Sequence, residues 1–325
     1  MPRILLTKPE GAVDVTGLAV SIRWSGDYRQ CARSLTLELL SPQKDPSVPG
    51  MDCPLGTPVS LLEGEKLLFS GYVFTRSGST AANTVTIGCC DPGLYLKRNE
   101  TTKQYASITP EAAVAALCDE FGIQVGHLAT TGVAVSRIFV GASLYQVAAT
   151  LYTLAAEITG KAYTIRFRGL SLCVEEKETE GGVLLLKGRS NLMDASISES
   201  AENLVNQVAV YDQDRKLLYE QSDGESIAQY GRMRQVVRQS AGMDASGKVR
   251  ELLEKSQPEQ KITVNCLGDT RCTAGNAVVV EAAGLYGLFW IDSDLHQWKN
   301  GVYTNRLTLN LKKVMDRQQA GQAVS

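Results

Sequence analysis

The sequence predicts a mainly β fold of the α+β class, in which two β regions flank a region of mixed α/β structure. Short segments with alternating apolar and polar residues occupy both ends of the chain, and two longer segments with helical spacing of apolar residues lie between them. The chain has 325 residues, enough for two or three domains of ordinary size. We expect domains at 1–98, 99–188 and 189–315, followed by a polar tail at 316–325.

Period-two alternation marks the strands of residues 1–98. In Ser34–Leu40, the leucines Leu35, Leu37 and Leu39 alternate with polar residues, which places them on one face of a half-buried strand. Several such strands at close spacing indicate a small barrel or sandwich. Further strands are expected over Pro58–Leu62, Lys66–Thr75 and Asn83–Cys90, with a proline-rich loop over 42–58.

Two amphipathic helices characterise the middle of the chain. Thr109, Pro110 and Glu111 form a helix start, because they supply a capping hydroxyl, a helical φ and an acid near the positive end of the helix dipole. A second helix is expected from Ser143 to Gly160, where apolar residues recur every three or four positions. The first helix is expected to end at Gly122, and a hairpin to follow the second helix over Tyr163–Phe167 and Leu170–Glu175.

Strands return in residues 189–315. Asn300-Gly301 is the strongest hairpin signal of the chain, because both residues tolerate the positive φ of a type I′ turn. One helix is expected inside this region, over Ala245–Lys255, with Asp244 as its cap. The tail over 316–325 is polar, and we expect it to be disordered. The strands are expected over Leu192–Glu199, Val205–Tyr211, Lys216–Gln221, Ile262–Cys266, Ala277–Glu281, Gly287–Leu295 and Val302–Leu311.

The charge balance and the hydropathy pattern exclude some classes of partner. The chain has 33 basic and 35 acidic side chains, a formal net charge of −2. A protein that holds duplex DNA shows a basic excess on one face, so the charge balance does not indicate duplex binding and fits protein partners instead. No apolar run is long enough to cross a bilayer, and the three apolar residues after Arg3 are too few for the core of a signal peptide. We therefore expect a protein made in the cytosol without stable membrane association.

The cysteines are scattered and form no Cys-x-x-Cys pair. The chain has only two histidines, so a zinc site is not expected. Reduced, buried thiols are the favoured interpretation, although Cys266 and Cys272 could become neighbours across a hairpin. The eight cysteines are Cys31, Cys53, Cys89, Cys90, Cys118, Cys173, Cys266 and Cys272.

A phosphate-binding loop is the first enzyme candidate. Gly242–Val249 has the G-x-x-x-x-G-K spacing, in which backbone N–H groups and a lysine bind phosphates. Val249 replaces the Ser or Thr that holds magnesium, and the preceding Arg234–Ser240 lacks the long apolar run of a buried parallel strand. A glycine-rich turn before a helix is the favoured interpretation.

Carboxylates beside a histidine are the second candidate. Asp292, Asp294 and His296 would share one side of an extended strand, as an acid–base or metal group requires. A solvent-facing strand edge before a turn is the favoured interpretation, and His127 is expected in a loop. Neither a Gly-x-Ser-x-Gly elbow nor a His-Glu-x-x-His motif occurs. The sequence therefore predicts no catalytic, metal or cofactor-binding residue, no cofactor and no enzymatic activity.

Three tryptophans could form a platform that stacks on a carbohydrate. Trp24 and Trp290 lie in strand-like apolar segments, so core packing is expected for both. Trp298 lies next to the Asn300-Gly301 turn and could be exposed.

Several segments, taken in order, carry a family resemblance. Ile22–Leu35 resembles the N-terminal signature of the XkdQ/YqbQ-type tail proteins of contractile prophages, which belong with the late control gene D and VgrG-like hub proteins. Ser200–Val210 resembles the strand that opens their second barrel. The resemblance spans most of residues 18–313 and is weakest over 99–188. Their later strands are matched in order by Glu259–Val264, Gly268, Ala274–Val280, Asp294–His296 and Leu307–Leu311.

The resemblance implies two antiparallel β-barrel domains of tube type, joined by an α/β domain, in a homotrimer. Two similar barrels in each of three chains give six quasi-equivalent positions around a channel. Such a ring would connect the tail tube protein to the central spike protein, with the tape measure protein and other baseplate proteins as further partners. The chain is then a structural hub subunit of the virion tail baseplate, assembled in the cytoplasm of the host bacterium.

Two other functions remain open from the sequence. A carbohydrate- or cell-wall-binding β protein would need exposed rows of aromatic side chains. A hydrolase would need Asp292, Asp294 or His296. The hub of a headless, tail-like bacteriocin has the same task as the hub of an intact phage, so the sequence does not separate these two.

Overall fold

The chain forms two compact units in the computed structural model, which describes residues 1–41, 52–78, 83–177, 183–239, 245–255, 257–282, 284–313 and 315–323. The larger unit combines Met1–Ala195 with Thr263–Ser325, and the smaller unit is Ser196–Ile262. The expected mainly β composition is confirmed, and within the described ranges none of the sheets closes on itself. The smaller unit interrupts the domain expected at 189–315, while the other expected boundaries stay predictions.

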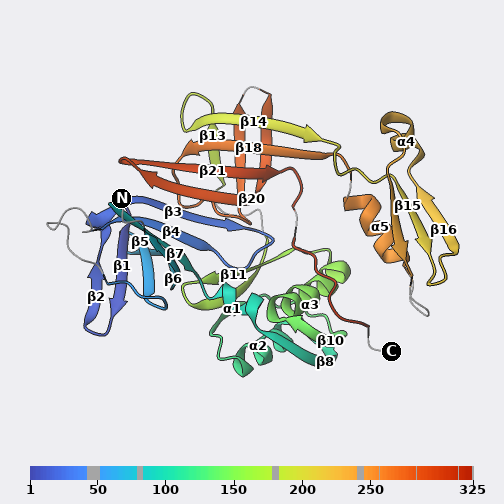
Figure 1. Ribbon diagram of the computed structural model, residues 1–325, viewed down its shortest axis with the longest axis horizontal. Helices are drawn as coiled ribbons and strands as arrows, with labels where there is room; N and C mark the ends of the chain where they lie inside the picture. The colour runs from blue at the N-terminus through green and yellow to red at the C-terminus, as the bar shows by residue number, and fades with distance from the viewer. Residues whose placement is uncertain are drawn as a thin grey trace. The chain divides into compact units, whose positions relative to one another are not determined.

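One 13-stranded sheet contains strands from both ends of the chain (Figure 1). Its strands are β1 (Arg3–Lys8), β2 (Gly11–Asp14), β3 (Ala19–Asp27), β4 (Ser34–Leu40), β5 (Pro58–Glu63), β6 (Lys66–Gly78), β7 (Thr84–Cys90), β13 (Leu184–Lys187), β14 (Leu192–Ser200), β18 (Glu259–Leu267), β19 (Ala277–Ala282), β20 (Leu285–Lys299) and β21 (Val302–Asn310). The main path runs β14-β18-β21-β20-β3-β4-β7-β6-β5-β1-β2. β19 pairs with the first part of β20 and β3 with its last part, so β20 joins the two halves of the sheet.

The strand and turn signals of this sheet are confirmed. Leu35, Leu37 and Leu39 are all buried, as the alternation in β4 predicts. Asn300 and Gly301 have φ values of 52° and 75° and link β20 to β21. Most of the expected proline-rich loop lies outside the described residues.

A mixed α/β region follows β7 in the larger unit. It contains α1 (Gly93–Arg98), β8 (Glu100–Ile108), α2 (Pro110–Glu120), β9 (Val125–Leu128), β10 (Val135–Ser143), α3 (Leu144–Thr159), β11 (Tyr163–Arg168) and β12 (Ser171–Glu176). Both expected helices are confirmed with their caps. Thr109 accepts a hydrogen bond from the Ala112 N–H, Ser143 forms a capping box with Gln146, and Gly160 ends α3 in the left-handed conformation.

The core of this region surrounds α3. Helix α3 is apolar on most sides, and Val147, Leu151 and Tyr152 are fully buried. The Tyr152 hydroxyl donates a hydrogen bond of 3.0 Å to the Ala129 carbonyl, which removes the cost of burying that polar group. Phe139 of β10 packs in the same cluster.

The C-terminal tail lies against α3 and β10, so the expected disorder is wrong for its described part. The backbone N–H groups of Gln318 and Ala320 donate to the hydroxyls of Thr153 and Thr150, at 3.2 and 3.1 Å. Gln322 forms a backbone bridge with β10. The two buried threonines of α3 supply acceptors that a polar composition alone does not reveal.

The smaller unit has a sheet and a core of its own. It contains β15 (Gln207–Tyr211), β16 (Leu217–Ser222), α4 (Gly224–Tyr230), β17 (Arg234–Arg238) and α5 (Ser246–Lys255). The strand order is β16-β15-β17, with β15 and β17 parallel. Val249 of α5 packs against Val208, Val210 and Val237. Because this apolar cluster is closed within Ser196–Ile262, these strands form a separate sheet instead of extending a barrel.

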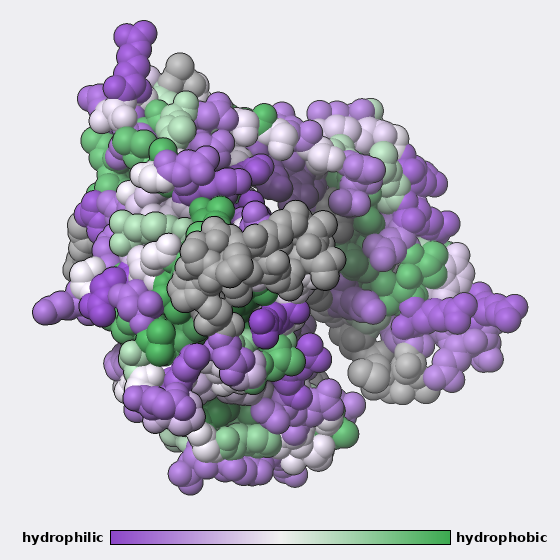
Figure 2. All heavy atoms as spheres, turned by 60° about the vertical axis from the view of Figure 1, so that its left-hand side comes forward, coloured by the Kyte–Doolittle hydropathy of each residue, from purple (hydrophilic) through white to green (hydrophobic). Residues whose placement is uncertain are grey.

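Hydrophobic residues on the visible face of the molecule form small patches between hydrophilic residues (Figure 2). Among the described residues, no helix combines the length and apolar character needed to span a membrane.

Candidate functional site

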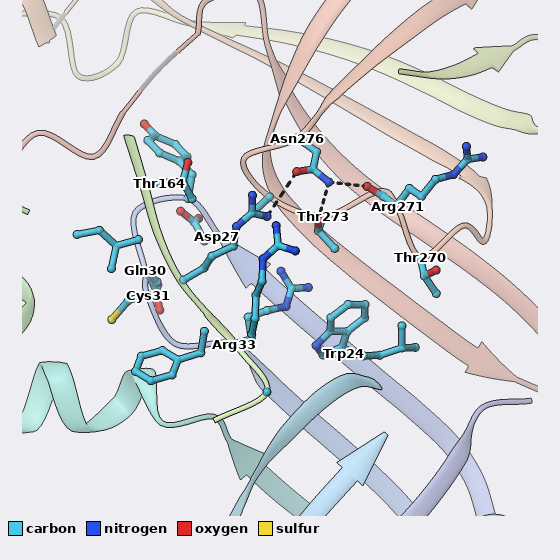
Figure 3. Close-up of a pocket in the computed structure, with 18 of the residues that line it drawn as sticks. Trp24, Asp27, Gln30, Cys31, Arg33, Thr164, Thr270, Arg271, Thr273 and Asn276 are labelled. Carbon is cyan, nitrogen blue, oxygen red and sulfur yellow. Dashed lines mark hydrogen bonds between the residues drawn. The ribbon is translucent and has the colours of Figure 1, made fainter. Parts of the chain in front are cut away.

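A cavity of about 560 Å³ lies in the larger unit (Figure 3). Its walls come from β3 and the turn that follows it, from the start of β6, from β11 and from the loop between β18 and β19. In Figure 3, Trp24 lies on one side of the cavity and Thr273 and Asn276 lie on the opposite side, with Arg33 between them. The cavity therefore joins four segments from different parts of the sequence.

A buried carboxylate, Asp294, lies beneath the cavity wall. Its side chain is completely enclosed, and the residue is only 3% exposed. Arg33 donates to both carboxylate oxygens, with 3.0 Å between Nη1 and Oδ1, and the Ala274 N–H donates to Oδ1 at 2.6 Å. Burial alone would raise the pKa of Asp294, but the charge of Arg33 and the hydrogen bonds from His296 and Arg33 outweigh it and lower the pKa.

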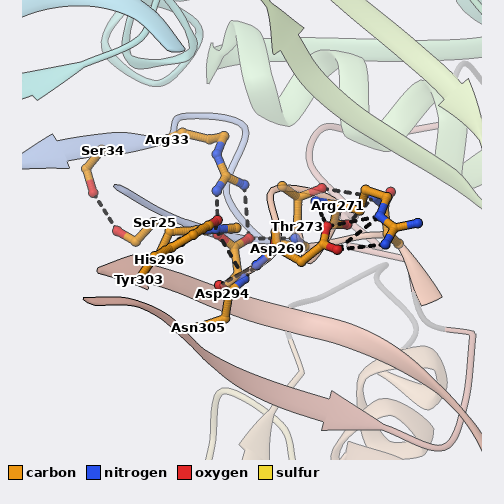
Figure 4. Close-up of polar contacts among 12 residues, drawn as sticks. Ser25, Arg33, Ser34, Asp269, Arg271, Thr273, Asp294, His296, Tyr303 and Asn305 are labelled. Carbon is orange, nitrogen blue, oxygen red and sulfur yellow. Dashed lines mark hydrogen bonds and ion pairs between the residues drawn. The ribbon is translucent and has the colours of Figure 1, made fainter. Parts of the chain in front are cut away.

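His296 continues the network on the other side of Asp294 (Figure 4). Its Nε2 lies 3.2 Å from Asp294 Oδ2, and its Nδ1 lies 2.7 Å from the Tyr303 hydroxyl and 3.2 Å from Asn305 Nδ2. Asn305 accepts from the Asp269 N–H and donates to the Asp269 carbonyl, which fixes its amide orientation. Since Asn305 Nδ2 can only donate, Nδ1 of His296 accepts, which places the ring proton on Nε2, facing Asp294.

Aromatic rings enclose this network. The Arg33 guanidinium carbon lies 4.2 Å from the Trp24 ring centroid, and the ring centroids of Trp24 and His296 are 4.5 Å apart. Trp298 stacks on Tyr303 with 4.2 Å between centroids. Asp294 and His296 are buried beneath these rings, so the Asp294 charge lies in a medium of low polarity. We call the polar members the buried polar junction: Arg33, Asp269, Asp294, His296, Tyr303 and Asn305.

The junction lies where β20 changes its neighbour from β19 to β3. The ladder is irregular there, with a register shift between Ile291 and Ser293. The Ile291 N–H donates to the Asn276 carbonyl, and the Ile291 carbonyl accepts from the Gly275 N–H. The next carbonyl, that of Asp292, instead accepts from the Tyr28 N–H. Side chains of the junction therefore connect the two halves of the sheet at the point where the backbone ladder is interrupted.

Two glycines make room for the junction. A Cβ atom on Gly26 would lie 2.3 Å from Arg33 Nη1, and a Cβ atom on Gly268 would lie 2.0 Å from the Tyr303 ring. Such distances are impossible for a side chain, so glycine is required for Arg33 to reach Asp294 and for Tyr303 to reach His296.

The structure brings together two of the three residues predicted on one side of the strand. Asp294 and His296 meet, and their predicted position on a solvent-facing edge is wrong because both are buried. Asp292 instead accepts a hydrogen bond of 3.2 Å from Asn310, because the register shift before Ser293 breaks the alternation. The hydrogen-bonding groups of Asp294 are fully engaged within the chain, which leaves it no free position for a substrate. The described residues contain no group of three or more ligands arranged for a metal ion.

The other residues considered in the sequence are scattered. Gly242–Asp244 lie outside the described residues, and Val249 of the same motif is buried against the sheet of the smaller unit. His127 is exposed on β9 and not in a loop. The burial expected for Trp24 and Trp290 is confirmed, and Trp298 is buried as well, at 6% exposure. The three rings therefore provide no exposed carbohydrate platform.

All eight cysteines are free, and seven of them are buried, with Cys90 half-buried. Burial raises the pKa of the Cys118 thiol to about 11 and that of Cys89 to about 12, which keeps both unreactive at neutral pH. Cys266 and Cys272 are neighbours whose thiols share a hydrogen bond, as their spacing suggested.

Most members of the junction carry no signal in the sequence that predicts their meeting. Arg33, Asp269, Tyr303 and Asn305 are separated by up to 272 positions and follow no local pattern. Gly26, which approaches Arg33, and Gly268, which precedes Asp269, are the sequence signal for such a site. An isolated glycine in or next to a strand indicates a close approach of other groups.

Comparison with known proteins gives a consistent result. A family model described as YQBQ-like matches residues 22–310. The uncharacterized protein YqbQ of Bacillus subtilis (strain 168) is 22% identical over 295 residues, covering 87% of this chain and 89% of that protein. The 43 kDa tail protein of prophage MuSo2 from Shewanella oneidensis has a similar fold, with a TM-score of 0.70, 15% identity and coverage of 95% and 98% of the two chains. A tail protein from Neisseria meningitidis MC58 gives a TM-score of 0.66 at 13% identity, covering 98% and 99%.

Proposed function

We propose, from the premise that this chain belongs to the YQBQ-like family, that it is a structural hub subunit in the baseplate of a contractile phage or prophage tail. The observation that carries the proposal is the likeness of fold to a prophage tail protein over nearly the whole length of both chains. The subunit joins the tail tube protein to the central spike protein. The tape measure protein and other baseplate proteins are its further partners, and DNA only passes through.

The two halves of the large sheet are proposed to act as two open barrels of tube type. One half runs from β3 to β2 along the sheet path, and the other runs from β20 to β14. Three chains with two such halves each would give six similar positions around a channel, which matches a hexameric tube. The strand β20 and the buried polar junction would hold the two halves of each subunit in fixed register.

The free edges of the sheet support a ring with head-to-tail contacts. β2 and β14 are the terminal strands of the main path, all four residues of β2 are exposed, and β14 exposes Met193 at 61%. Unpaired edges with apolar residues invite pairing with other chains, so a soluble protein has to cover them. In the proposed homotrimer, neighbouring subunits cover these edges.

Native mass tests this proposal directly. Three copies of the 35.2 kDa chain have a mass of about 106 kDa, and light scattering coupled to size exclusion should find a species near that value or a multiple of it. Negative-stain images of that species should show a ring with a central channel. A monomer at every concentration, or a particle without a channel, contradicts the free-standing trimer.

A further inference from the structure

The cavity beside the junction is lined by an excess of positive charge. Asp27 is the one acidic side chain among its described lining residues, and it already pairs with Arg29, which lies outside the lining, at 3.2 Å. The cationic lining residues are Arg33, Lys66, Arg166, Arg168 and Arg271.

Two of these cations are fully neutralised within the chain. Arg33 forms its two-pronged contact with Asp294, and Arg271 forms one with Asp269, at 2.7 Å between Nη2 and Oδ2. Neither pair leaves charge for a ligand. The excess must therefore come from the remaining three side chains.

Among the described residues, the other three cations have one carboxylate between them, that of Glu175. Arg166 and Arg168 both pair with Glu175, one with each of its oxygens. Lys66 makes a hydrogen bond of 3.5 Å to the Thr270 hydroxyl and no ion pair with any described residue. In the described part of the chain, about two positive charges of the cavity lining thus remain without an ion-pair partner.

The cations can be reached by a ligand. The Arg168 side chain is 66% exposed, and Arg166 beside it is 27% exposed. Leu67 of β6 also lines the cavity and is 45% exposed, so an apolar side chain lies next to Lys66 and forms an apolar wall. The cavity therefore offers carboxylate-binding groups around an apolar patch.

We propose that this cavity binds an acidic peptide segment of a protein partner, whose side-chain carboxylates pair with Arg166, Arg168 and Lys66. Guanidinium groups bind carboxylates through paired, charge-assisted hydrogen bonds, which gives orientation as well as affinity. The apolar wall accommodates a side chain between two acidic residues. The proposal depends on this cavity alone, and the homotrimer is not needed for it.

A nucleic acid fits the observations less well. Nucleic-acid sites extend along the surface as a basic stripe and produce a basic chain overall. Here the unbalanced cations are confined to one cavity of about 560 Å³, and the chain has a net charge of −2. A segment of a few residues matches this volume better than a continuous phosphate backbone does.

Fluorescence anisotropy with the full-length protein tests the site. The probe is fluorescein-labelled hexaglutamate, with labelled hexaglutamine and a single-stranded oligonucleotide of equal charge as comparisons. We expect hexaglutamate to bind more tightly than both, and salt to weaken it. Arg168→Gln and Lys66→Gln should each weaken binding about fivefold, and the double variant should weaken it by more than tenfold.

A matched control distinguishes the cavity from general surface charge. Arg306→Gln removes an exposed arginine of β21 outside the cavity and should leave hexaglutamate binding unchanged. Thermal unfolding of every variant confirms that the fold is kept, since all three side chains are on the surface. Equal binding of hexaglutamine or the oligonucleotide, or equal losses in Arg306→Gln and Arg168→Gln, overturns the proposal.

Discussion

The buried polar junction and the core around α3 both contain fully buried side chains but are stabilised by opposite means. The α3 core is built from apolar side chains such as Val147 and Leu151. The junction encloses a carboxylate, a guanidinium and an imidazole, each held by specific partners. An apolar core can relax around a lost group, whereas a polar junction that loses one partner keeps an unpaired charge in a dry environment. The two regions should therefore respond differently to substitution.

Asp294→Asn should give the largest loss. Arg33 and His296 would lose the negative charge between them, and removing one partner of a buried pair costs about 4 kcal/mol of unfolding free energy. Urea unfolding followed by circular dichroism measures the change. The matched variant Asp292→Asn removes a half-buried carboxylate with a single amide partner and should cost about 1 kcal/mol. Equal losses of unfolding free energy in the two variants would contradict the larger contribution expected from the buried Asp294 carboxylate.

Leu151→Ala should cost slightly less, about 3 kcal/mol, because it leaves a cavity in a core that can partly collapse. Leu154→Ala, at a partly buried position of the same helix, should cost clearly less. The same urea titrations give both values. A loss larger than that of Asp294→Asn would reverse the expected order of the two regions.

Gly268→Ala tests how tightly the junction is packed. The new Cβ atom would overlap the Tyr303 ring and push it away from His296, at a cost of about 2 kcal/mol. Gly17→Ala is the control, because a Cβ atom there meets nothing within 4 Å. Differential scanning calorimetry should show a lowered melting temperature for the first variant alone. Similar melting temperatures for both variants would indicate that Tyr303 moves without cost.

Asp91→Asn should change the pH dependence more than the stability itself. Burial raises the pKa of Asp91 to about 7, although the N–H groups of Arg33 and Gly93 partly offset it. The folded state therefore binds this proton more tightly than the unfolded chain, so stability from this group is present below pH 3.8 and is lost as pH rises to about 7. Unfolding free energies at about pH 5 and about pH 7.5 should fall more steeply in the wild type than in Asp91→Asn. Parallel changes would contradict the raised pKa.

The sequence predicts local structure well because local signals cause it. Thr109 and Ser143 start their helices and Asn300-Gly301 turns its hairpin, as expected, since each effect depends on neighbouring residues. The junction could not be predicted in the same way. One extra residue in β20 moves Asp292 away from Asp294, and alternation alone cannot reveal such a bulge.

Two other parts of the fold depended on distant contacts. The strands of the smaller unit have the same alternation as those of the large sheet, so only their closed cluster around Val249 separates them. The polar tail is ordered by Thr150 and Thr153, about 165 to 170 positions earlier in the chain. The composition of a segment therefore does not decide whether the segment is ordered, because order also depends on hydrogen-bonding partners in another segment.

The pairing of β3 with β20 also has a consequence during synthesis. Trp24 lies opposite His296, so the ribosome must add most of the chain before β3 finds its second neighbour, which takes on the order of tens of seconds. β4, β7, β6, β5 and β1 can pair as soon as they emerge. Until then one edge of β3 is unpaired, and Arg33 lacks its partner, the Asp294 carboxylate. The nascent chain is therefore most exposed to wrong pairing with other chains late in translation, when a chaperone that covers β3 would help most.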